Sequence, residues 1–415
     1  MGGEWNSTTL DKIVNIRTGK LDSNRATNNG LYPFFTCAPD PLNIDEFAYD
    51  EDAILLAGNN ANGVFHVNRY KGKFNAYQRT YIITAKDDKK VSLDFIYYTL
   101  KTLGSAFESL SLGTATKFLT MKVLAPFEVN LPLLGTQKAI AHILGCLDDK
   151  IELNRRMNAT LEAMARALFK SWFVDFDPVI DNALAAGNPI PEPLQTRAKA
   201  RKSLGDQRKP LPAAIQKQFP SRFVFTEEMG WVPEGWEVKK IGEILELAYG
   251  KSLPATKRRA GDIPVYGSGG MSGFHNEKLV DGPGVVIGRK GTVGSLYWVD
   301  GNFFPIDTVF YVVSKIHVPL YWLYQSLQLI DIKSMGADSA VPGVNRNAVY
   351  ARSLAIPAKV IFDGYLTQVG AYNSRSKELS GQNETLSGLR DTLLPKMISG
   401  QLRVPDAEQL LAEVT

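Results

Sequence analysis

The chain has 415 residues, and at roughly 100–200 residues per domain this length predicts two to four domains. Hydrophobic residues make up 44% and charged residues 22%, which excludes a disordered, highly charged chain. The net charge of +4 is too small to indicate a nucleic-acid partner by itself. Two widely separated cysteines fit a reducing compartment, and no signal peptide or run of about 18 apolar residues is present, so we expect a cytoplasmic protein without a membrane span.

The sequence contains one long internal repeat. A shift of 231 residues aligns the start of the chain with its middle, and the shift falls to 225 toward the end of each copy. The aligned pairs are Trp5 with Trp236, Gly19-Lys20 with Gly250-Lys251, Pro33 with Pro264, Pro132 with Pro357 and Leu168 with Leu393. Solenoid repeats have only about 20–45 residues, so this period predicts a duplicated domain pair with pseudo-two-fold symmetry. The alternative is two unrelated domains with similar turn residues.

The first part of each copy, about residues 4–135 and 235–358, is predicted to be an α+β domain. Short apolar runs bounded by turn residues predict strands at Ala53–Ala57, Thr80–Thr84, Val285–Gly288 and Val309–Val313. Helices are expected at matching places in the two copies, over Phe95–Leu103 and Pro319–Leu329.

The second part of each copy is predicted to be a long helix. Thr136 to Phe173 contains no proline, and its apolar positions alternate in steps of three and four, which is typical of a coiled-coil seam. The seam positions in the first copy are Leu144, Leu147, Ile151, Asn154, Asn158, Leu161, Ala165 and Leu168; in the second they are Val369, Tyr372, Leu379, Asn383, Leu386 and Leu393. The paired occurrence favours two helices that pack on each other over a helix that lies flat on its own domain.

Between the copies, Asp177 to Gly230 is predicted to be irregular. Prolines recur through it, and residues 195–222 carry eight basic residues against one acidic residue. We interpret this stretch as a solvated basic linker that phosphates would attract without regard to sequence.

The sequence lacks the common motifs of catalytic and metal-binding sites. No histidine has zinc-ligand spacing, there is no Walker A sequence, and no Asp-Pro-Pro-Tyr-type methyltransferase motif occurs. Glu237-Val238-Lys239 matches half of a nuclease signature but lacks a preceding metal-binding aspartate. The sequence therefore predicts a binding protein that holds no metal and no cofactor of its own.

Several loops combine basic or amide side chains with glycine, as contacts to base edges and phosphates require. Gly58–Gly63 follows a predicted strand, and Gly288–Thr292 stands at the equivalent place in the second copy. The candidate DNA-binding residues are Lys20, Asn59, Asn60, Asn62, Gln78, Arg79, Thr116, Lys117, Lys251, Lys257, Arg258, Arg259, Arg289, Lys290, Asn345 and Arg346. The alternative for each loop is an ordinary hairpin turn.

The layout resembles the specificity subunit of type I restriction-modification systems over about residues 4–402. The resemblance rests on the tandem domain-plus-helix repeat, on Trp5 and Gly19-Lys20 with their matches in Pro233–Trp236 and Gly250-Lys251, and on Leu131–Leu133 followed by Gln137–Ile140 and Leu161–Phe173. The second copy retains Ile356-Pro357 but blurs the pattern of Gln followed by Ile near Gln368, so the start of its helix is not fixed by the sequence.

The resemblance implies a fold of two α+β target-recognition domains joined by two long antiparallel coiled-coil helices. Its expected boundaries are 1–135 for the first domain, 136–175 for the first helix, 176–230 for the Pro-rich linker, 231–358 for the second domain, 359–402 for the second helix and 403–415 for a tail. Each domain would read one half-site of a bipartite target in double-stranded DNA.

The same resemblance implies the partners. Two methyltransferase subunits would dock on the helices and bring S-adenosylmethionine, and a motor and endonuclease subunit would bring ATP and Mg²⁺. The helix residues expected to form the seam and its partner contacts are Leu144, Leu147, Ile151, Asn154, Asn158, Leu161, Leu168, Leu379, Asn383, Leu386 and Leu393. The chain itself would be non-catalytic. Two alternatives stay open: a protein-interaction scaffold, and a nuclease or methyltransferase whose site has an unfamiliar pattern.

Overall fold

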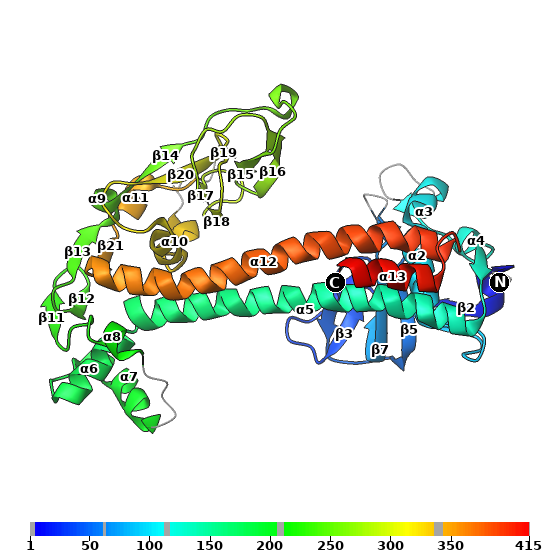
Figure 1. The fold of residues 1–415 in the computed structure, drawn as a ribbon, viewed down its shortest axis with the longest axis horizontal. Coiled ribbons are helices and arrows are strands. Elements are labelled where there is room, and N and C mark those ends of the chain that lie inside the picture. The colour runs from blue at the N-terminus through cyan, green and yellow to red at the C-terminus, as the bar shows by residue number, and fades with distance from the viewer. Residues whose placement is uncertain (1–4, 61–63, 112–116, 206–210, 336–342, 415) are drawn as a thin grey trace. The chain divides into compact units, whose positions relative to one another are not determined.

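The computed structural model of the chain describes residues 5–60, 64–111, 117–205, 211–335 and 343–414. It divides into two compact units. Unit 1 comprises the residues up to Met157 together with those from Glu378 onward, and unit 2 comprises Asn158–Lys377. Two long helices, α5 (Leu134–Phe173) and α12 (Lys359–Ile398), each contribute residues to both units (Figure 1).

A six-stranded sheet is the framework of unit 1. Its strand order is β2-β8-β5-β7-β3-β4, and every neighbouring pair is antiparallel except β3 with β7. The strands are β2 (Val14–Thr18), β8 (Thr80–Ala85), β5 (Tyr49–Ala57), β7 (Val67–Ala76), β3 (Tyr32–Phe35) and β4 (Leu42–Ile44). The end of β5, Ala53–Ala57, is buried on both faces, which explains its unbroken apolar run. Two small pairs join β1 (Asn6–Thr9) to β10 (Glu128–Leu131) and β6 (Asn59–Asn60) to β9 (Lys117–Phe118).

Helices pack on one face of this sheet and share its core. They are α1 (Leu10–Ile13), α2 (Leu93–Thr102), α3 (Gly104–Leu110), α4 (Met121–Leu124) and α13 (Val404–Val414). A short turn of helix, η1 (Ser23–Arg25), buries no side chain. The core of unit 1 joins Phe95 and Ile96 of α2 to Leu144 of α5. Gln137 fixes the start of α5, because its fully buried amide accepts a hydrogen bond from the Ser92 N–H and donates to the carbonyls of Lys90 and Pro132.

Unit 2 repeats the order of four of these strands. Its main sheet is β14-β20-β17-β18, which corresponds to β2-β8-β5-β7 of unit 1. The strands are β14 (Leu245–Tyr249), β20 (Val309–Ser314), β17 (Gly284–Gly288) and β18 (Leu296–Val299). Beside it lies β16-β15-β19, with β16 (Gly270–His275), β15 (Ile263–Gly267) and β19 (Phe304–Pro305), and β13 (Glu237–Lys240) pairs with β21 (Ser353–Ile356). The shared topology confirms that the sequence repeat is a structural duplication.

The helices that lie between β13 and β21 in the sequence follow the same plan. They are α9 (Ile241–Ile244), η3 (Ala255–Lys257), α10 (Leu320–Gln328), η4 (Ile332–Met335) and α11 (Arg346–Tyr350). α10 buries Trp322 and Leu323 in the core of unit 2, in the same way that α2 buries its apolar residues in unit 1. The helices predicted over Phe95–Leu103 and Pro319–Leu329 are therefore present as α2 and α10.

The long helices pack antiparallel within unit 1. Asp148 of α5 accepts a hydrogen bond from Arg390 of α12 at 2.7 Å, and Asn154 of α5 donates to Asn383 of α12 at 3.0 Å. Residue numbers therefore increase along α5 where they decrease along α12. Burial alone would raise the pKa of Asp148, but the hydrogen bond from Arg390 and the charge of Lys101 outweigh burial and hold that pKa below its ordinary value. Asp148 thus remains a charged partner for Arg390.

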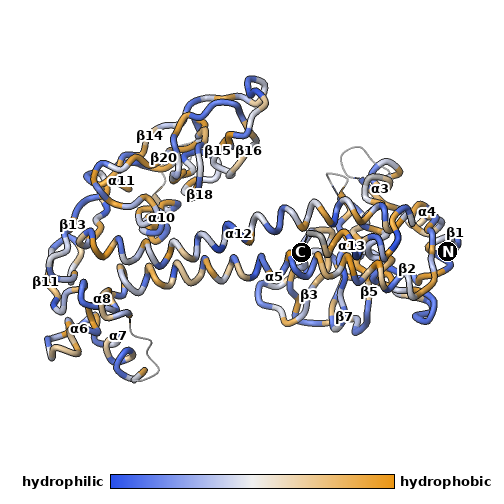
Figure 2. The backbone as a smooth tube through the Cα atoms, in the orientation of Figure 1, coloured by the Kyte–Doolittle hydropathy of each residue, from blue (hydrophilic) through white to orange (hydrophobic). Residues whose placement is uncertain are grey.

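The same two helices also pack within unit 2. Ring pairs join Phe169 and Phe173 of α5 to Tyr365 of α12, at centroid distances of 6.1 and 5.0 Å. Figure 2 shows hydrophobic and hydrophilic residues alternating along both helices, as expected where one face is buried and the other is not. These contacts confirm the predicted α+β fold with long antiparallel helices and place the start of the second helix at Lys359.

The prediction that Asp177–Gly230 is irregular was wrong. This stretch contains α6 (Asp177–Ala186), α7 (Glu192–Ser203), α8 (Ala213–Gln216) and a hairpin of β11 (Phe223–Thr226) with β12 (Gly230–Pro233). Pro178 and Pro193 stand in the first turns of α6 and α7, where proline needs no amide partner and starts a helix instead of breaking it.

Ion pairs with buried carboxylates hold α6 and α7 together. Asp177 accepts two hydrogen bonds from Arg197, at 2.8 and 2.7 Å, and Asp181 is paired in the same manner with Arg201. The two aspartates are four residues apart, as are the two arginines, so the carboxylates and guanidinium groups lie on facing sides of their helices. Two of the four basic residues of α7, Arg197 and Arg201, are thus neutralised by aspartates that precede them in the sequence. The basic charge of this stretch therefore does not indicate a solvated linker.

Candidate nucleic-acid interface

Loops that are far apart in the sequence meet at one place in unit 1. The Gln78 N–H donates to the carbonyl of Leu21, and the Gly58 N–H donates to the carbonyl of Arg79, each at 2.8 Å. Asn60 pairs with Lys117 across β6 and β9. These bonds gather the predicted residues that we call the unit 1 loop cluster: Lys20, Asn59, Asn60, Gln78, Arg79 and Lys117.

Close backbone approach explains the glycine that precedes Lys20. A Cβ atom on Gly19 would overlap the carbonyl oxygen of Ala76, and one on Gly250 would overlap the carbonyl oxygen of Ile306. The N–H groups of these glycines donate to Thr80 and Val309. Gly19-Lys20 and Gly250-Lys251 are thus held in the same way in the two units, and both lysines are exposed.

The unit 1 loop cluster presents cations and amides. Lys20, Gln78 and Arg79 are exposed. The Arg79 guanidinium lies 5.2 Å from the centre of the Phe118 ring, so that ring positions the arginine while its hydrogen-bonding groups remain available. Asn59 is half-buried, and its amide oxygen accepts a hydrogen bond from the Cys37 thiol.

Unit 2 has an equivalent set of loops. The Arg289 N–H donates to the carbonyl of Thr308, which is equivalent to the bond from the Gly58 N–H to the Arg79 carbonyl in unit 1. Lys290 forms a backbone β-bridge with Gly343. The unit 2 loop cluster therefore contains Lys251, Arg289, Lys290 and Arg346, with the exposed Tyr249 between them.

Two arginines of this cluster share one aromatic ring. The guanidinium carbons of Arg289 and Arg346 lie 5.1 and 4.9 Å from the centre of the Tyr249 ring. Arg289 donates to the Asp307 carbonyl at 2.6 Å and Arg346 to the Leu247 carbonyl at 3.1 Å. Across the described residues, neither guanidinium forms an ion pair with a carboxylate. Two like charges beside one ring, without a counterion, suit a phosphate.

Other predicted residues lie outside these clusters. Arg258 donates to the Ser272 carbonyl at 2.5 Å, and the Arg259 N–H donates to Nδ1 of His275, so Lys257–Arg259 borders β16. The Asn345 side chain accepts hydrogen bonds from the N–H groups of Asn347 and Ala348 and caps α11. Asn62 and Thr116 lie outside the described residues.

Sequence reasoning missed three side chains of the clusters. Cys37 contacts Asn59, and Phe118 contacts Arg79. Tyr249 contacts both arginines of the unit 2 loop cluster. Tyr249 precedes Gly250-Lys251, so an aromatic residue directly before a glycine and a lysine was an available signal. Cys37 is 22 residues from Asn59, and no local pattern links them.

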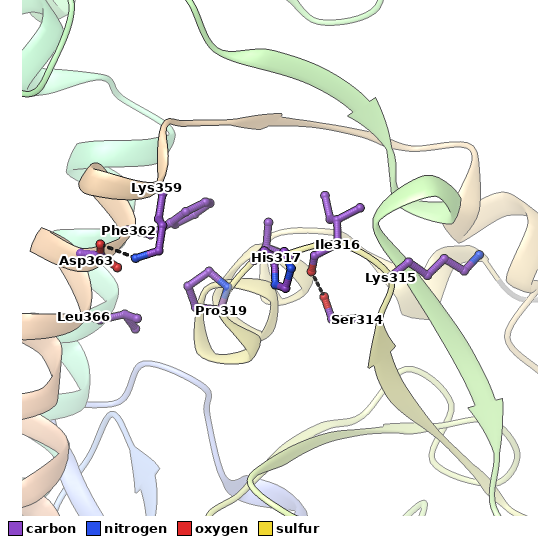
Figure 3. A pocket seen from close by; sticks show the side chains of 10 residues that line it. Ser314, Lys315, Ile316, His317, Pro319, Lys359, Phe362, Asp363 and Leu366 are labelled. Carbon is purple, nitrogen blue, oxygen red and sulfur yellow. Dashed lines mark hydrogen bonds and ion pairs between the residues drawn. The ribbon is translucent and has the colours of Figure 1, made fainter.

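Each unit also has a pocket where its long helix begins. In unit 2 a pocket of about 560 Å³ lies between the first turns of α12 and the Ser314–Pro319 segment that joins β20 to α10. Figure 3 shows Phe362, Asp363 and Leu366 on the helix side, and Lys359 forms an ion pair with Asp363 at 2.7 Å. In unit 1 a pocket of about 590 Å³ is lined by Lys138 and Ala141, which the repeat aligns with Asp363 and Leu366, and by Ser92 at the start of α2.

Two classes of site are absent within the described ranges. No three histidine, cysteine or acidic side chains are arranged to hold a metal ion. No helix in the described part of the chain is both long and apolar enough to span a bilayer.

The sequence matches the family described as "Type I restriction modification DNA specificity domain" over residues 2–163 and 233–360, which together form more than half of the chain. The chain belongs to this specificity-subunit family. It is 35% identical over 165 residues to the EcoDI specificity subunit of Escherichia coli, a match that covers 40% of this chain and 35% of that subunit. It is 25% identical over 327 residues to the HindI specificity subunit of Haemophilus influenzae, covering 68% of this chain and 71% of that subunit.

A solved specificity subunit has the same fold. The S subunit of a type I restriction-modification system from M. genitalium superposes with a TM-score of 0.59 at 19% identity, over 95% of this chain and 96% of that one. The specificity-subunit family therefore accounts for the duplication, for the long helices and for the two matched segments, each of which contains one loop cluster.

Proposed function

We propose that this specificity subunit reads a bipartite target in double-stranded DNA, with one half-site for each loop cluster. The observation that carries the proposal is the equivalence of the clusters: the same backbone bonds hold Gly58–Asn60 in unit 1 and Arg289-Lys290 in unit 2. The backbone hydrogen bonds are repeated while the side chains differ, as expected of two domains that recognise different bases. Amides and guanidinium groups are the side chains that discriminate base edges.

We further propose that the chain supplies no catalysis. Methyl transfer would need a partner subunit with S-adenosylmethionine, and cleavage would need a motor and endonuclease subunit with ATP and Mg²⁺. The purified chain is expected to bind specific duplex DNA with an affinity that falls steeply with salt, yet to transfer no methyl group from S-adenosylmethionine. Adding the methyltransferase subunit is expected to start methylation at one bipartite sequence. Methylation by the chain alone, or methylation by the complex without any sequence preference, would contradict this function.

The pockets at the helix starts support docking of two copies of one partner. Leu144 and Leu393 are buried within unit 1, so a partner must approach the outer surface of α5 and α12, not the seam between them. Lys138 and Ala141 of one pocket align with Asp363 and Leu366 of the other, so the pockets occupy equivalent places in the two units although their charges differ. One methyltransferase copy for each pocket gives the two copies that the specificity-subunit role requires.

Bulky substitutions test this docking. Lys138→Trp and Asp363→Trp are each expected to reduce the complex from two methyltransferase copies to one, because each change places a large side chain in one pocket, where it would clash with the partner. The double variant is expected to bind none, as measured by native mass spectrometry. Lys71→Trp, the same kind of change at an exposed position on β7, is the matched control and should retain both copies. Two copies on the double variant would exclude the pockets as docking sites.

A further inference from the structure

The thiol of Cys37 contacts the amide of Asn59 in the unit 1 loop cluster. Cys37 follows β3, and its Sγ lies 2.8 Å from Oδ1 of Asn59 and 3.6 Å from the carbonyl oxygen of Arg79. Both side chains are half-buried, so the contact is sheltered without being closed to a ligand. We propose that Cys37 is a positioning residue for Asn59, and that the pair makes one position of the first half-site reject cytosine. This inference rests on the proposed function.

The thiol decides which end of the amide points outward. An asparagine side chain has a donor end and an acceptor end, and its terminal torsion is broad, so an unrestrained amide offers either end to a base. A thiol has one hydrogen to donate, and the shorter of its two contacts is the one to Oδ1 of Asn59. The oxygen is therefore turned toward Cys37. Among the described residues, Nδ2 of Asn59 has no hydrogen-bond partner.

The surroundings of Asn59 place it where a duplex would arrive. Asn59 pairs with Phe118 across β6 and β9, and the Arg79 guanidinium lies over the Phe118 ring. Lys117 is the next residue on β9. Cations near an amide are suited to hold the phosphate backbone while the amide meets a base edge. The amide of Asn59 is thus a candidate for direct reading, and Arg79 and Lys117 are candidates for phosphate contact.

A donor held outward selects among bases. In the major groove the purines present N7, guanine adds O6 and thymine presents O4, all of which accept a hydrogen bond, whereas cytosine presents its N4 amino donor. The Nδ2 of Asn59 would face that amino group with no acceptor between them. Two-point recognition of adenine needs both ends of the amide aimed at the base, and the bond to Cys37 removes the oxygen from that geometry. The expected result is a position that accepts several bases and excludes cytosine.

The second repeat has different side chains at the two aligned positions. The shift of 231 residues places Ser268 at the position of Cys37 and Lys290 at that of Asn59. A Cβ atom on Gly291 would lie 2.9 Å from Oγ of Ser268, so the side chain at this position borders the same loop in unit 2. Different residue pairs at one structural place are expected where the two domains prefer different bases.

The test compares two replacements of Cys37 in the complete methyltransferase complex, with methylation profiling of a genome or a random-sequence library. Cys37→Ser retains a donor at the same place and is expected to leave the recognised sequence unchanged. Cys37→Val has a similar size but no donor, so the amide is free to turn. Discrimination against cytosine at one position of the first half-site is expected to fall by about tenfold, as removal of one hydrogen bond to a base would cause. The second half-site is the internal control.

A second variant keeps the test decisive if Cys37→Val fails to fold. Asn59→Asp replaces the outward donor with an acceptor, and a carboxylate accepts from the cytosine amino group. The preference at that same position is expected to turn toward cytosine. An unchanged first half-site in both Cys37→Val and Asn59→Asp would overturn the inference while leaving the proposed function intact. A wild-type complex with no bipartite motif would overturn both.

Discussion

Duplicating one heptad in each long helix is expected to lengthen the non-specific gap between the half-sites by about three base pairs. Seven residues add roughly 10 Å of helix, and base pairs rise about 3.4 Å. The duplicated segments would be residues 155–161 of α5, directly after Asn154, and residues 376–382 of α12, directly before its partner Asn383. A whole heptad preserves the seam, so both half-site sequences should stay the same.

The matched control is the same duplication in α5 alone. Asn154 pairs with Asn383 in unit 1, while Phe169 and Phe173 pack on Tyr365 in unit 2. An insertion in one helix cannot satisfy both sets of contacts, so this variant is expected to lose most of its activity and to melt at a lower temperature. The measurement is methylation profiling of each variant assembled with its partners. A gap that does not change in an active double variant would show that the helices do not set the spacing.

Removing the paired arginines of unit 2 is expected to weaken DNA binding by about 100-fold, or roughly tenfold for each charge-assisted hydrogen bond that is removed. Arg289 and Arg346 hold two positive charges at one tyrosine without a carboxylate partner in the described residues. Neutralising both by substitution with glutamine should also reduce the slope of log affinity against log salt by about two, because two fewer counterions are released. If the two arginines bind phosphates, their replacement lowers affinity equally for all DNA sequences. If one of them binds a base, its replacement relaxes the specificity at one position of the second half-site.

Arg352→Gln is the matched control for this pair. Arg352 is an exposed arginine just beyond the other end of α11 and is not part of the cluster. It should change affinity little, and thermal melting of all variants separates weaker binding from weaker folding. This matters most for Arg289, which also supports the Asp307 carbonyl. Wild-type affinity and salt dependence in the folded double variant would exclude the arginine pair from the DNA interface.

The parts of the fold that depend on local pattern could be predicted from the sequence. The unbroken apolar run at Ala53–Ala57 and its match at Val285–Gly288 indicated buried strands, and the structure has β5 and β17 there. The three-and-four spacing from Leu144 onward indicated a long helix, which α5 confirms. These signals are strong because periodicity and burial are imposed on every residue of such elements.

Features that depend on distant partners could not be predicted in this way. α6 and α7 occur where prolines and basic residues suggested a linker, because Arg197 and Arg201 are neutralised by Asp177 and Asp181, 20 residues earlier. Proline position within a helix, not proline content, decides whether a helix forms.

The candidate site shows the same division. Lys20, Gln78 and Arg79 could be proposed from residue type beside glycine or at a turn, and the structure gathers them in one cluster. The roles of Asn345 as a helix cap and of Cys37 beside Asn59 follow from side-chain geometry that a single sequence does not encode locally. The sequence thus indicated candidate loops, and the structure divides their residues between exposed side chains and structural supports.

Exchange of one domain tests the central claim most directly. Residues 1–135 would be replaced by the corresponding segment of another specificity subunit with a different first half-site, and the variant would be assembled with its methyltransferase partner. Methylation profiling is expected to show the donor's first half-site joined to the unchanged second half-site of this chain, because each loop cluster is held by its own unit. A change in both half-sites, or retention of both in an active complex that carries the foreign domain, would contradict the account.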